Sequence, residues 1–79
     1  MKVIATITNQ VNQGDSVQVF VNFSGGDYSQ DYIFNVPNDA NVQANIQAEI
    51  DSVGKDYKAS WEQMDNSNPP DLVGQTTNI

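Results

Sequence analysis

Apolar and polar side chains alternate in the first half of the chain along three runs, Lys2–Val11, Ser16–Ser24 and Tyr28–Val36. Alternation with a period of two indicates β-strands that place one face on a core. The β-branched residues that dominate the first two runs suit a pleated surface. The links Asn12–Asp15 and Ser24–Asp27 carry residues typical of tight turns, including a Gly-Gly pair that permits positive φ angles. The pattern predicts a three-stranded antiparallel meander within residues 1–37.

Each predicted strand has one apolar face. In chain order, the residues expected on this core face are Val3, Ala5, Ile7, Val11, Val17, Val19, Val21, Phe23, Tyr32, Phe34 and Val36. Phe20 and Ile33 are the apolar exceptions in the second and third runs, since the alternation points them to the opposite face.

A helical period replaces the alternation after Pro37, which ends the third strand. Apolar residues spaced by three and four positions form one stripe, as in an amphipathic helix. The stripe consists of Val42, Ile46, Ile50, Val53, Tyr57, Trp61 and Met64. Asn38 or Asp39 can cap the first turn, so we predict a helix over residues 38–64. Gly54 costs about 1 kcal/mol relative to Ala inside a helix and indicates either a kink or an early end.

The last residues, 65–79, follow the predicted helix. Asn66–Pro70 is expected to break it, and Gln75–Ile79 forms either a short fourth strand or a flexible tail. A length of 79 residues allows one domain. Residues 1–79 are therefore expected to comprise the meander (1–37), the helix (38–64) and a C-terminal loop with a candidate strand (65–79). One helix across one face of a small sheet is an α+β architecture.

The composition narrows the classes of protein that this fold can serve. The chain has ten acidic residues against three lysines, a net charge of −7, and no Arg, His or Cys. Disulfides and the usual zinc ligands are therefore excluded. Direct nucleic-acid binding is not expected, because it needs clustered cations. No apolar run is long enough for a membrane span or an export signal, so we expect neither a membrane partner nor secretion by a signal peptide.

Side chains that carry catalysis are scarce in this sequence. Without His or Cys there is no imidazole base and no thiolate. Glu49 and Asp51 are two residues apart on the predicted helix, so they do not share a face. A segment starting at Asp65 begins like a calcium loop, but Pro70 and Thr76 stand where that loop needs Gly and a bidentate Glu. We therefore predict a non-enzymatic protein with no catalytic residues, cofactor, metal or small-molecule substrate.

Two apolar groups are candidate partner-binding surfaces. They are the sheet group, Ile4, Phe20 and Ile33, and the helix-end group, Tyr57, Trp61 and Met64. The sheet group is either a contact surface on the uncovered sheet face, a set of scattered surface residues, or covered by the C-terminal segment. The helix-end group is either an interface or a continuation of the core stripe. A domain this small buries a marginal core, which favours a protein partner or self-association.

The run Tyr32–Ala40, followed by Ile46–Ile50 and later Leu72–Gln75, resembles small tailed-bacteriophage proteins. These often join a short sheet to an amphipathic helix through a Val-Pro junction. The resemblance implies a non-enzymatic virion component, such as a capsid decoration (cement) or connector-associated protein. Its partners would be other protein subunits of the virion lattice or further copies of itself. Its location would be the virion or the host cytoplasm.

The alternative function is that of a small acidic phage inhibitor of a host nucleic-acid-binding enzyme, since such a protein can present carboxylates where phosphates would bind. The acidic residues on or beside the predicted helix are Asp39, Glu49, Asp51, Asp56, Glu62 and Asp65. Their spacing distributes them around the helix instead of along one row. The sequence therefore favours the structural role.

Overall fold

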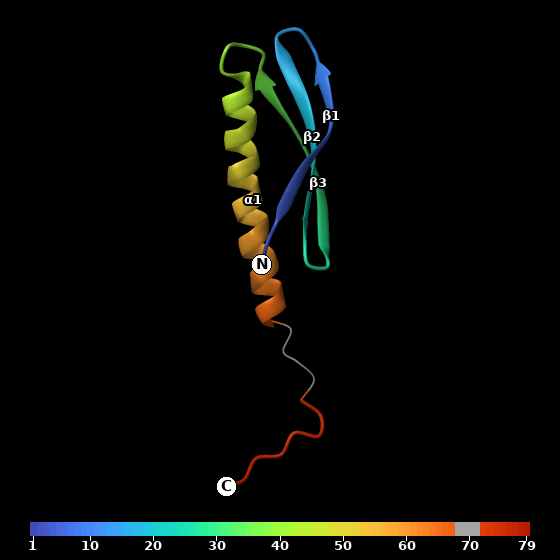
Figure 1. Cartoon of the computed structure of the whole chain (residues 1–79), viewed down its shortest axis with the longest axis vertical. Helices are drawn as coiled ribbons and strands as arrows, with labels where there is room; N and C mark the ends of the chain where they lie inside the picture. Colours follow the sequence, from blue (N-terminus) through green and yellow to red (C-terminus); the bar gives the residue numbers. More distant parts are fainter. Residues whose placement is uncertain (68–71) are drawn as a thin grey trace.

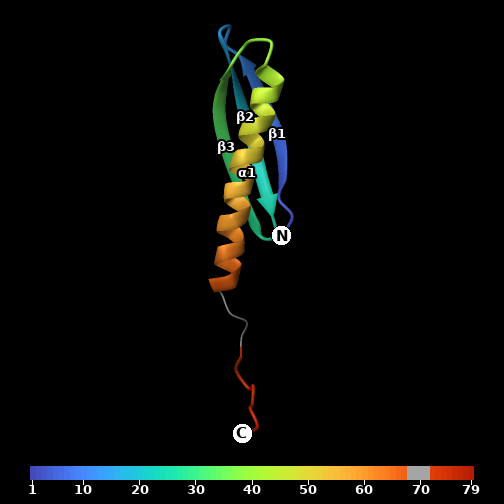
Figure 2. The ribbon, with the colours of Figure 1, turned by 90° about the vertical axis from the view of Figure 1, so that its left-hand side faces the viewer.

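The computed structural model describes residues 1–67 and 72–79. The elements are three strands, β1 (Ile4–Asn12), β2 (Ser16–Gly25) and β3 (Tyr28–Pro37), and one helix, α1 (Val42–Ser67). The strands form an antiparallel sheet in the order β1-β2-β3, and α1 runs along one face of it (Figures 1 and 2). The predicted α+β architecture, a meander followed by one long helix, is confirmed.

Both hairpins use a glycine with a positive φ angle. Gly26 has a φ of 56° in the link between Gly25 and Tyr28, which pair directly. Glycine at the first of two link residues is what a type II′ turn requires. In the first hairpin Gly14 has a φ of 88°, and its N–H donates to the side-chain oxygen of Asn12 at 2.9 Å. The turn residues predicted from the sequence therefore form the two hairpins.

β1 carries an irregularity at Thr8 that exchanges the two faces of the strand. Ile7 pairs with Val21, whose side chain is buried on the side of α1. Beyond the register shift, Val11 pairs with Gln18 on the opposite face. One extra residue in a strand turns over every side chain that follows it. The prediction that Val11 lies on the core face is therefore wrong.

The central strand β2 carries most of the core. Its odd-numbered residues from Val17 to Phe23 are at most 3% exposed. Phe34 and Val36 of β3 and Trp61 of α1 complete the buried set. The partly buried residues packed against it are Val3, Tyr28, Tyr32, Val42, Ile46, Ile50, Val53 and Tyr57. The predicted core faces of β2 and β3 and the predicted helical stripe therefore meet.

α1 begins at Val42, later than the predicted residue 38. The carboxylate of Asp39 accepts a hydrogen bond of 2.8 Å from the N–H of Asn41, which precedes α1, so Asp39 stabilises the turn that leads into the helix. Asn38 instead donates from its side chain to the carbonyl oxygen of Gly14 at 2.9 Å. This bond fastens the end of β3 to the first hairpin and leaves Asn38 outside the helix.

The helix continues through Gly54 without interruption and ends at Ser67, so the predicted bounds of 38–64 become 42–67. Residues 72–79 contain a turn, in which the N–H of Gln75 donates to the carbonyl oxygen of Leu72 at 3.0 Å. They contain no strand, so a fourth strand over Gln75–Ile79 does not form. The predicted helix break at Asn66–Pro70 falls partly on residues 68–71, which lie outside the described residues.

Replacing Gly54 by Ala is expected to raise the free energy of unfolding by about 0.5–1 kcal/mol, since Ala has the higher helix propensity. An added Cβ would lie 3.4 Å from Cε1 and 3.8 Å from Cδ1 of the Phe23 ring, which is ordinary van der Waals contact. Urea denaturation followed by circular dichroism measures the change. A less stable variant would show that the ring cannot accept the methyl group.

Candidate protein-binding surfaces

The face of the sheet that α1 does not cover, the open face, brings Phe20 and Ile33 together. These residues are direct partners across β2 and β3. Ile33 is 54% exposed and Phe20 is half-buried. Val11, which is 38% exposed, reaches this face because of the irregularity in β1 and lies diagonal to Phe20. The structure therefore yields an exposed apolar cluster of Phe20, Ile33 and Val11.

Ile4 lies on the same face but apart from this cluster. It is 52% exposed and pairs with Ser24, at the other end of β2. The row containing Asn22 and Asp31 lies between, where the Asn22 amide donates to the Asp31 carboxylate at 2.9 Å. The same amide donates to the hydroxyl of Ser29 at 3.0 Å. The expected clustering therefore holds for two of the three residues in the sheet group.

The open face is almost free of charge. Among the strand positions that share it, Asp31 is the one ionisable side chain, and its carboxylate accepts the bond from Asn22. The other positions are apolar, hydroxyl, amide or proline side chains. A surface of this kind can be dehydrated on contact without removing unpaired charges from water.

The helix-end group belongs largely to the core. Trp61 is 6% exposed and stacks between Tyr28 and Tyr57, with ring centroids 5.5 Å and 5.3 Å away. Tyr57 also contacts Phe23, at a centroid distance of 5.2 Å. Met64 is 40% exposed. Because Trp61 is buried, little of its surface is available to a partner. This burial agrees with the alternative in which the helix-end group continues the core stripe.

Two tyrosines of β3 hold the sheet to α1 through carboxylates. The hydroxyl of Tyr28 donates to Asp65 at 2.7 Å, and that of Tyr32 donates to Glu49 at 3.0 Å. These hydrogen bonds are the main cause that raises the pKa of each phenol above 10.0, followed by desolvation. The carboxylate favours the protonated phenol, because ionisation would place two negative charges side by side.

Both bonds are expected to weaken only in strong alkali. A folded-state pKa above the unfolded value means that the folded chain holds the phenol proton more tightly than the unfolded chain does. The contribution of each hydrogen bond to the free energy of unfolding is therefore complete below pH 10.0 and declines as the pH rises through the raised pKa. Asp65→Asn should shift the titration of Tyr28 towards 10.0 in a near-ultraviolet absorbance titration. A Tyr28 titration that does not respond to Asp65→Asn would exclude the carboxylate as its cause.

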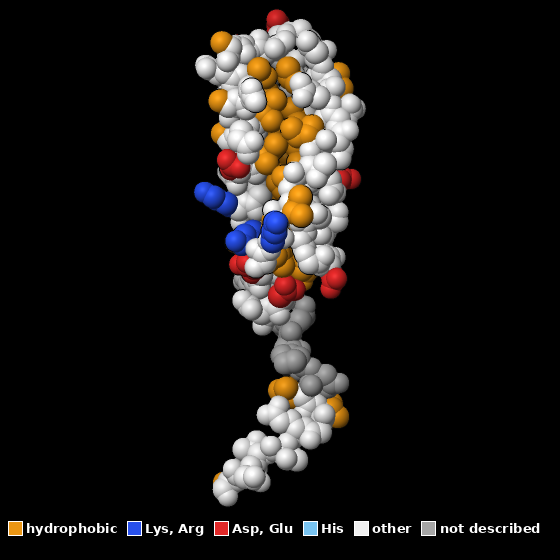
Figure 3. Space-filling model, viewed as in Figure 1, with side chains coloured by type: hydrophobic (Ala, Val, Ile, Leu, Met, Phe, Trp, Pro, Cys, Tyr) orange, Lys and Arg blue, Asp and Glu red, His pale blue; other side chains and the backbone are white. Residues whose placement is uncertain are grey.

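A groove separates α1 from β1 on the helix side of the sheet. A helix is about 10 Å wide, whereas three strands with their side chains span about 14 Å. The groove has a volume of about 500 Å³ and is lined from the strand side by residues 1–3, Ala5 and Phe23. Figure 3 shows hydrophobic side chains exposed as a seam between the two elements. Ile7 of β1 is accordingly 47% exposed although it faces the helix side.

The described residues contain few arrangements that could support other kinds of chemistry. Residues 1–67 and 72–79 hold no group of three or more acidic side chains placed to bind a metal ion. They also hold no buried polar side-chain atom without a hydrogen-bond partner. The part of the chain that is described has no helix with the length and apolarity needed to cross a membrane.

Comparison with protein-family models, with curated proteins and with solved structures gives no match. The sequence pattern identified Phe20 and Ile33 but missed Val11 and the groove. The polar residue Asn9, which interrupts the odd-numbered apolar series in β1, is the signal that could have revealed the change of face.

Proposed function

We propose that this chain is a non-enzymatic structural protein that binds other protein subunits through the open face of its sheet. We place it in a bacteriophage particle, as a capsid decoration or connector-associated component. The observation that carries the proposal is the exposed cluster of Phe20, Ile33 and Val11 on a nearly uncharged face.

The cluster supports protein binding because of what surrounds it. Antiparallel sheets often expose one face to water, but that face is then usually polar. Here a half-buried Phe and a largely exposed Ile lie side by side in the middle of the sheet. Interfaces are enriched in aromatic residues and depleted of charge at their centres. In a chain with a net charge of −7, a face with one carboxylate repels another acidic subunit only weakly.

The assignment to a phage particle is supported by the sequence resemblance of the sheet–helix junction. Pro37 ends β3 and Asp39 stabilises the turn before α1, as that junction suggests. The scarcity of catalytic side chains is compatible with a structural role. Other protein subunits, in the lattice or in a self-associated form, are the proposed partners.

Mass spectrometry of purified particles tests this function. The chain is expected in the particles in a fixed ratio to the major capsid or connector protein, and it should remain there after washing at high salt, since an uncharged contact is weakly screened. Its absence from particles would contradict the proposal. Capture of a host nuclease or polymerase by the isolated chain, with loss of binding at high salt, would favour the inhibitor function instead.

A further inference from the structure

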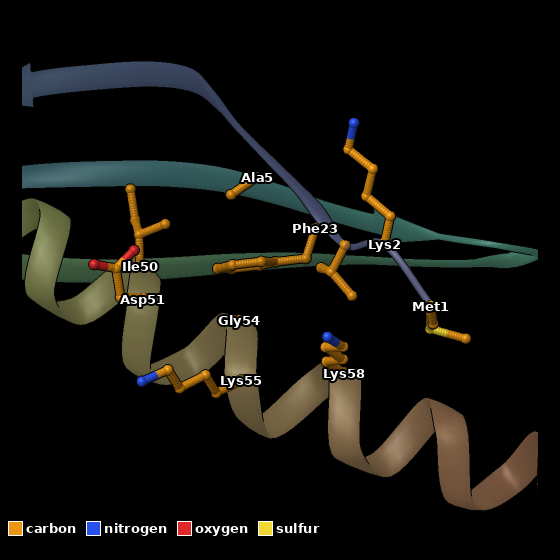
Figure 4. A pocket seen from close by; sticks show the side chains of 10 residues that line it. Met1, Lys2, Ala5, Phe23, Ile50, Asp51, Gly54, Lys55 and Lys58 are labelled. Carbon is orange, nitrogen blue, oxygen red and sulfur yellow. The ribbon is translucent and has the colours of Figure 1, made fainter.

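All three lysines of the chain line the groove between α1 and β1. Lys2 comes from the segment before β1, and Lys55 and Lys58 come from α1 (Figure 4). The chain has ten acidic residues, yet among residues 1–67 and 72–79 Asp51 is the one acidic side chain that lines this groove. The side-chain cations are therefore concentrated at a single place on an otherwise acidic molecule.

The three ammonium groups are not neutralised within the described chain. The ion pair found among residues 1–67 and 72–79 joins the amino group of Met1 to Glu62 at 3.1 Å and involves no lysine side chain. The i, i+4 spacing of Asp51 and Lys55 would allow a pair. The Asp51 carboxylate instead accepts a hydrogen bond of 2.8 Å from the amide of Gln47. The lysines thus remain available to an anionic ligand.

The floor of the groove is apolar. Ala5 of β1 and Ile50 of α1 form its accessible part, beside the ring of Phe23, which is itself fully buried (Figure 4). The Lys58 side chain extends from α1 towards the segment before β1, whereas the Lys2 side chain points away from α1 on the opposite wall. Gly54 places no side chain in the groove; a Cβ added at this position would lie 3.4 Å from the Phe23 ring. An apolar floor beside two cations of the helix wall, Lys55 and Lys58, suits a ligand that is itself amphipathic and acidic.

The open shape of the groove favours an extended peptide. Small-molecule sites usually enclose 70–90% of their ligand, whereas this groove is exposed along its length (Figure 3). Nucleic acid would bring a row of phosphates close to a molecule with a net charge of −7. A short peptide presents its carboxylates at spaced positions and its apolar side chains between them.

We propose that the groove between α1 and β1 binds an extended peptide segment of a partner protein, in which carboxylates flank apolar anchor side chains. The apolar anchor contacts Ala5 and Ile50, and the carboxylates pair with Lys55 and Lys58. This site is separate from the open face, so it does not depend on the function proposed above.

A fluorescent hexapeptide of alternating Asp and Leu is the probe for this site. It is expected to bind, and its affinity should fall as salt is added, because the pairs at the rim are exposed. A peptide of alternating Asp and Ser lacks the apolar anchor and should bind at least about ten-fold more weakly. A peptide of alternating Lys and Leu lacks the charge complementarity and should bind more weakly by at least about the same factor. No binding of the Asp-Leu peptide, or equal binding of all three, would overturn the proposal.

The double variant Lys55→Gln/Lys58→Gln tests the residues. It should weaken binding by about ten-fold, since each exposed ion pair contributes up to about five-fold. The control, Asn45→Asp/Gln63→Glu, changes the net charge by the same two units at exposed helix positions that do not line the groove. It should weaken binding by less than about two-fold through long-range repulsion. Equal losses of peptide affinity in both variants would show that net charge alone determines binding and would contradict the assignment of the site to the groove.

Amide chemical shifts locate the peptide. The amides of Ala5 and Gly54 are expected to move on titration, and those of Phe20 and Ile33 are expected to stay. The reverse pattern would place the peptide on the open face and overturn the proposal. A single-stranded oligonucleotide of equal charge that binds as tightly as the peptide would overturn the choice of ligand.

Discussion

Phe23→Ala is expected to lower the free energy of unfolding by about 3–5 kcal/mol. Phe23 is fully buried, and its ring contacts Tyr57 at a centroid distance of 5.2 Å and Tyr32 at 6.4 Å. It therefore fills the position where the central strand, the edge strand β3 and α1 meet. Removing the ring leaves a cavity that a single helix over a small sheet has little means to close.

Such a loss is large for this protein. A domain of this length has a total stability of about 4–12 kcal/mol, so the variant should lose at least about a quarter of it. Urea denaturation followed by circular dichroism measures the change. Phe20→Ala is the matched control, because Phe20 lies on the same strand but on the open face. It should cost about 1 kcal/mol or less, and equal costs at the two positions would contradict the assignment of faces.

Phe20→Asp is expected to reduce incorporation of the chain into particles by about 30-fold or more. Hot-spot residues at the centre of an interface contribute at least about 2 kcal/mol, and a carboxylate placed there would also lose its hydration without gaining a partner. Quantitative mass spectrometry of particles assembled with the variant measures the loss. The free variant should remain folded, since position 20 faces away from the core.

Two comparisons make the Phe20→Asp experiment decisive. Asn45→Asp adds the same charge at an exposed position of α1 and is expected to leave incorporation unchanged. The thermal unfolding curve of free Phe20→Asp should keep its cooperative transition, which separates lost binding from lost folding. Normal incorporation of Phe20→Asp would contradict the role of the open face, and so would an equal loss with Asn45→Asp.

Local periodicity was sufficient to predict the elements of this fold. The alternation in Ser16–Ser24 identified the buried residues of β2, because every second side chain of a central strand faces the core. The stripe from Val42 to Trp61 likewise identified the face of α1 that packs on the sheet. Gly54 does not end the helix, which continues through it beside the ring of Phe23.

The surfaces were harder to predict, since they depend on how the elements are placed. The irregularity at Thr8 moves Val11 to the open face, and only the pairing with β2 reveals it. Trp61 at the end of the helical stripe is buried because the second hairpin brings Tyr28 beside it. The groove arises from the width of one helix relative to three strands, so no local pattern shows that Lys2 lies near Lys58.

The central claim is that the open face of the sheet contacts another protein subunit. A photoreactive benzoylphenylalanine in place of Phe20 tests it directly, because the new side chain is aromatic and lies on the same face. Irradiation of assembled particles is expected to link position 20 to a neighbouring subunit, whereas the same group at position 45 of α1 should give no such product. Cross-links from position 45 without any from position 20 would contradict the account.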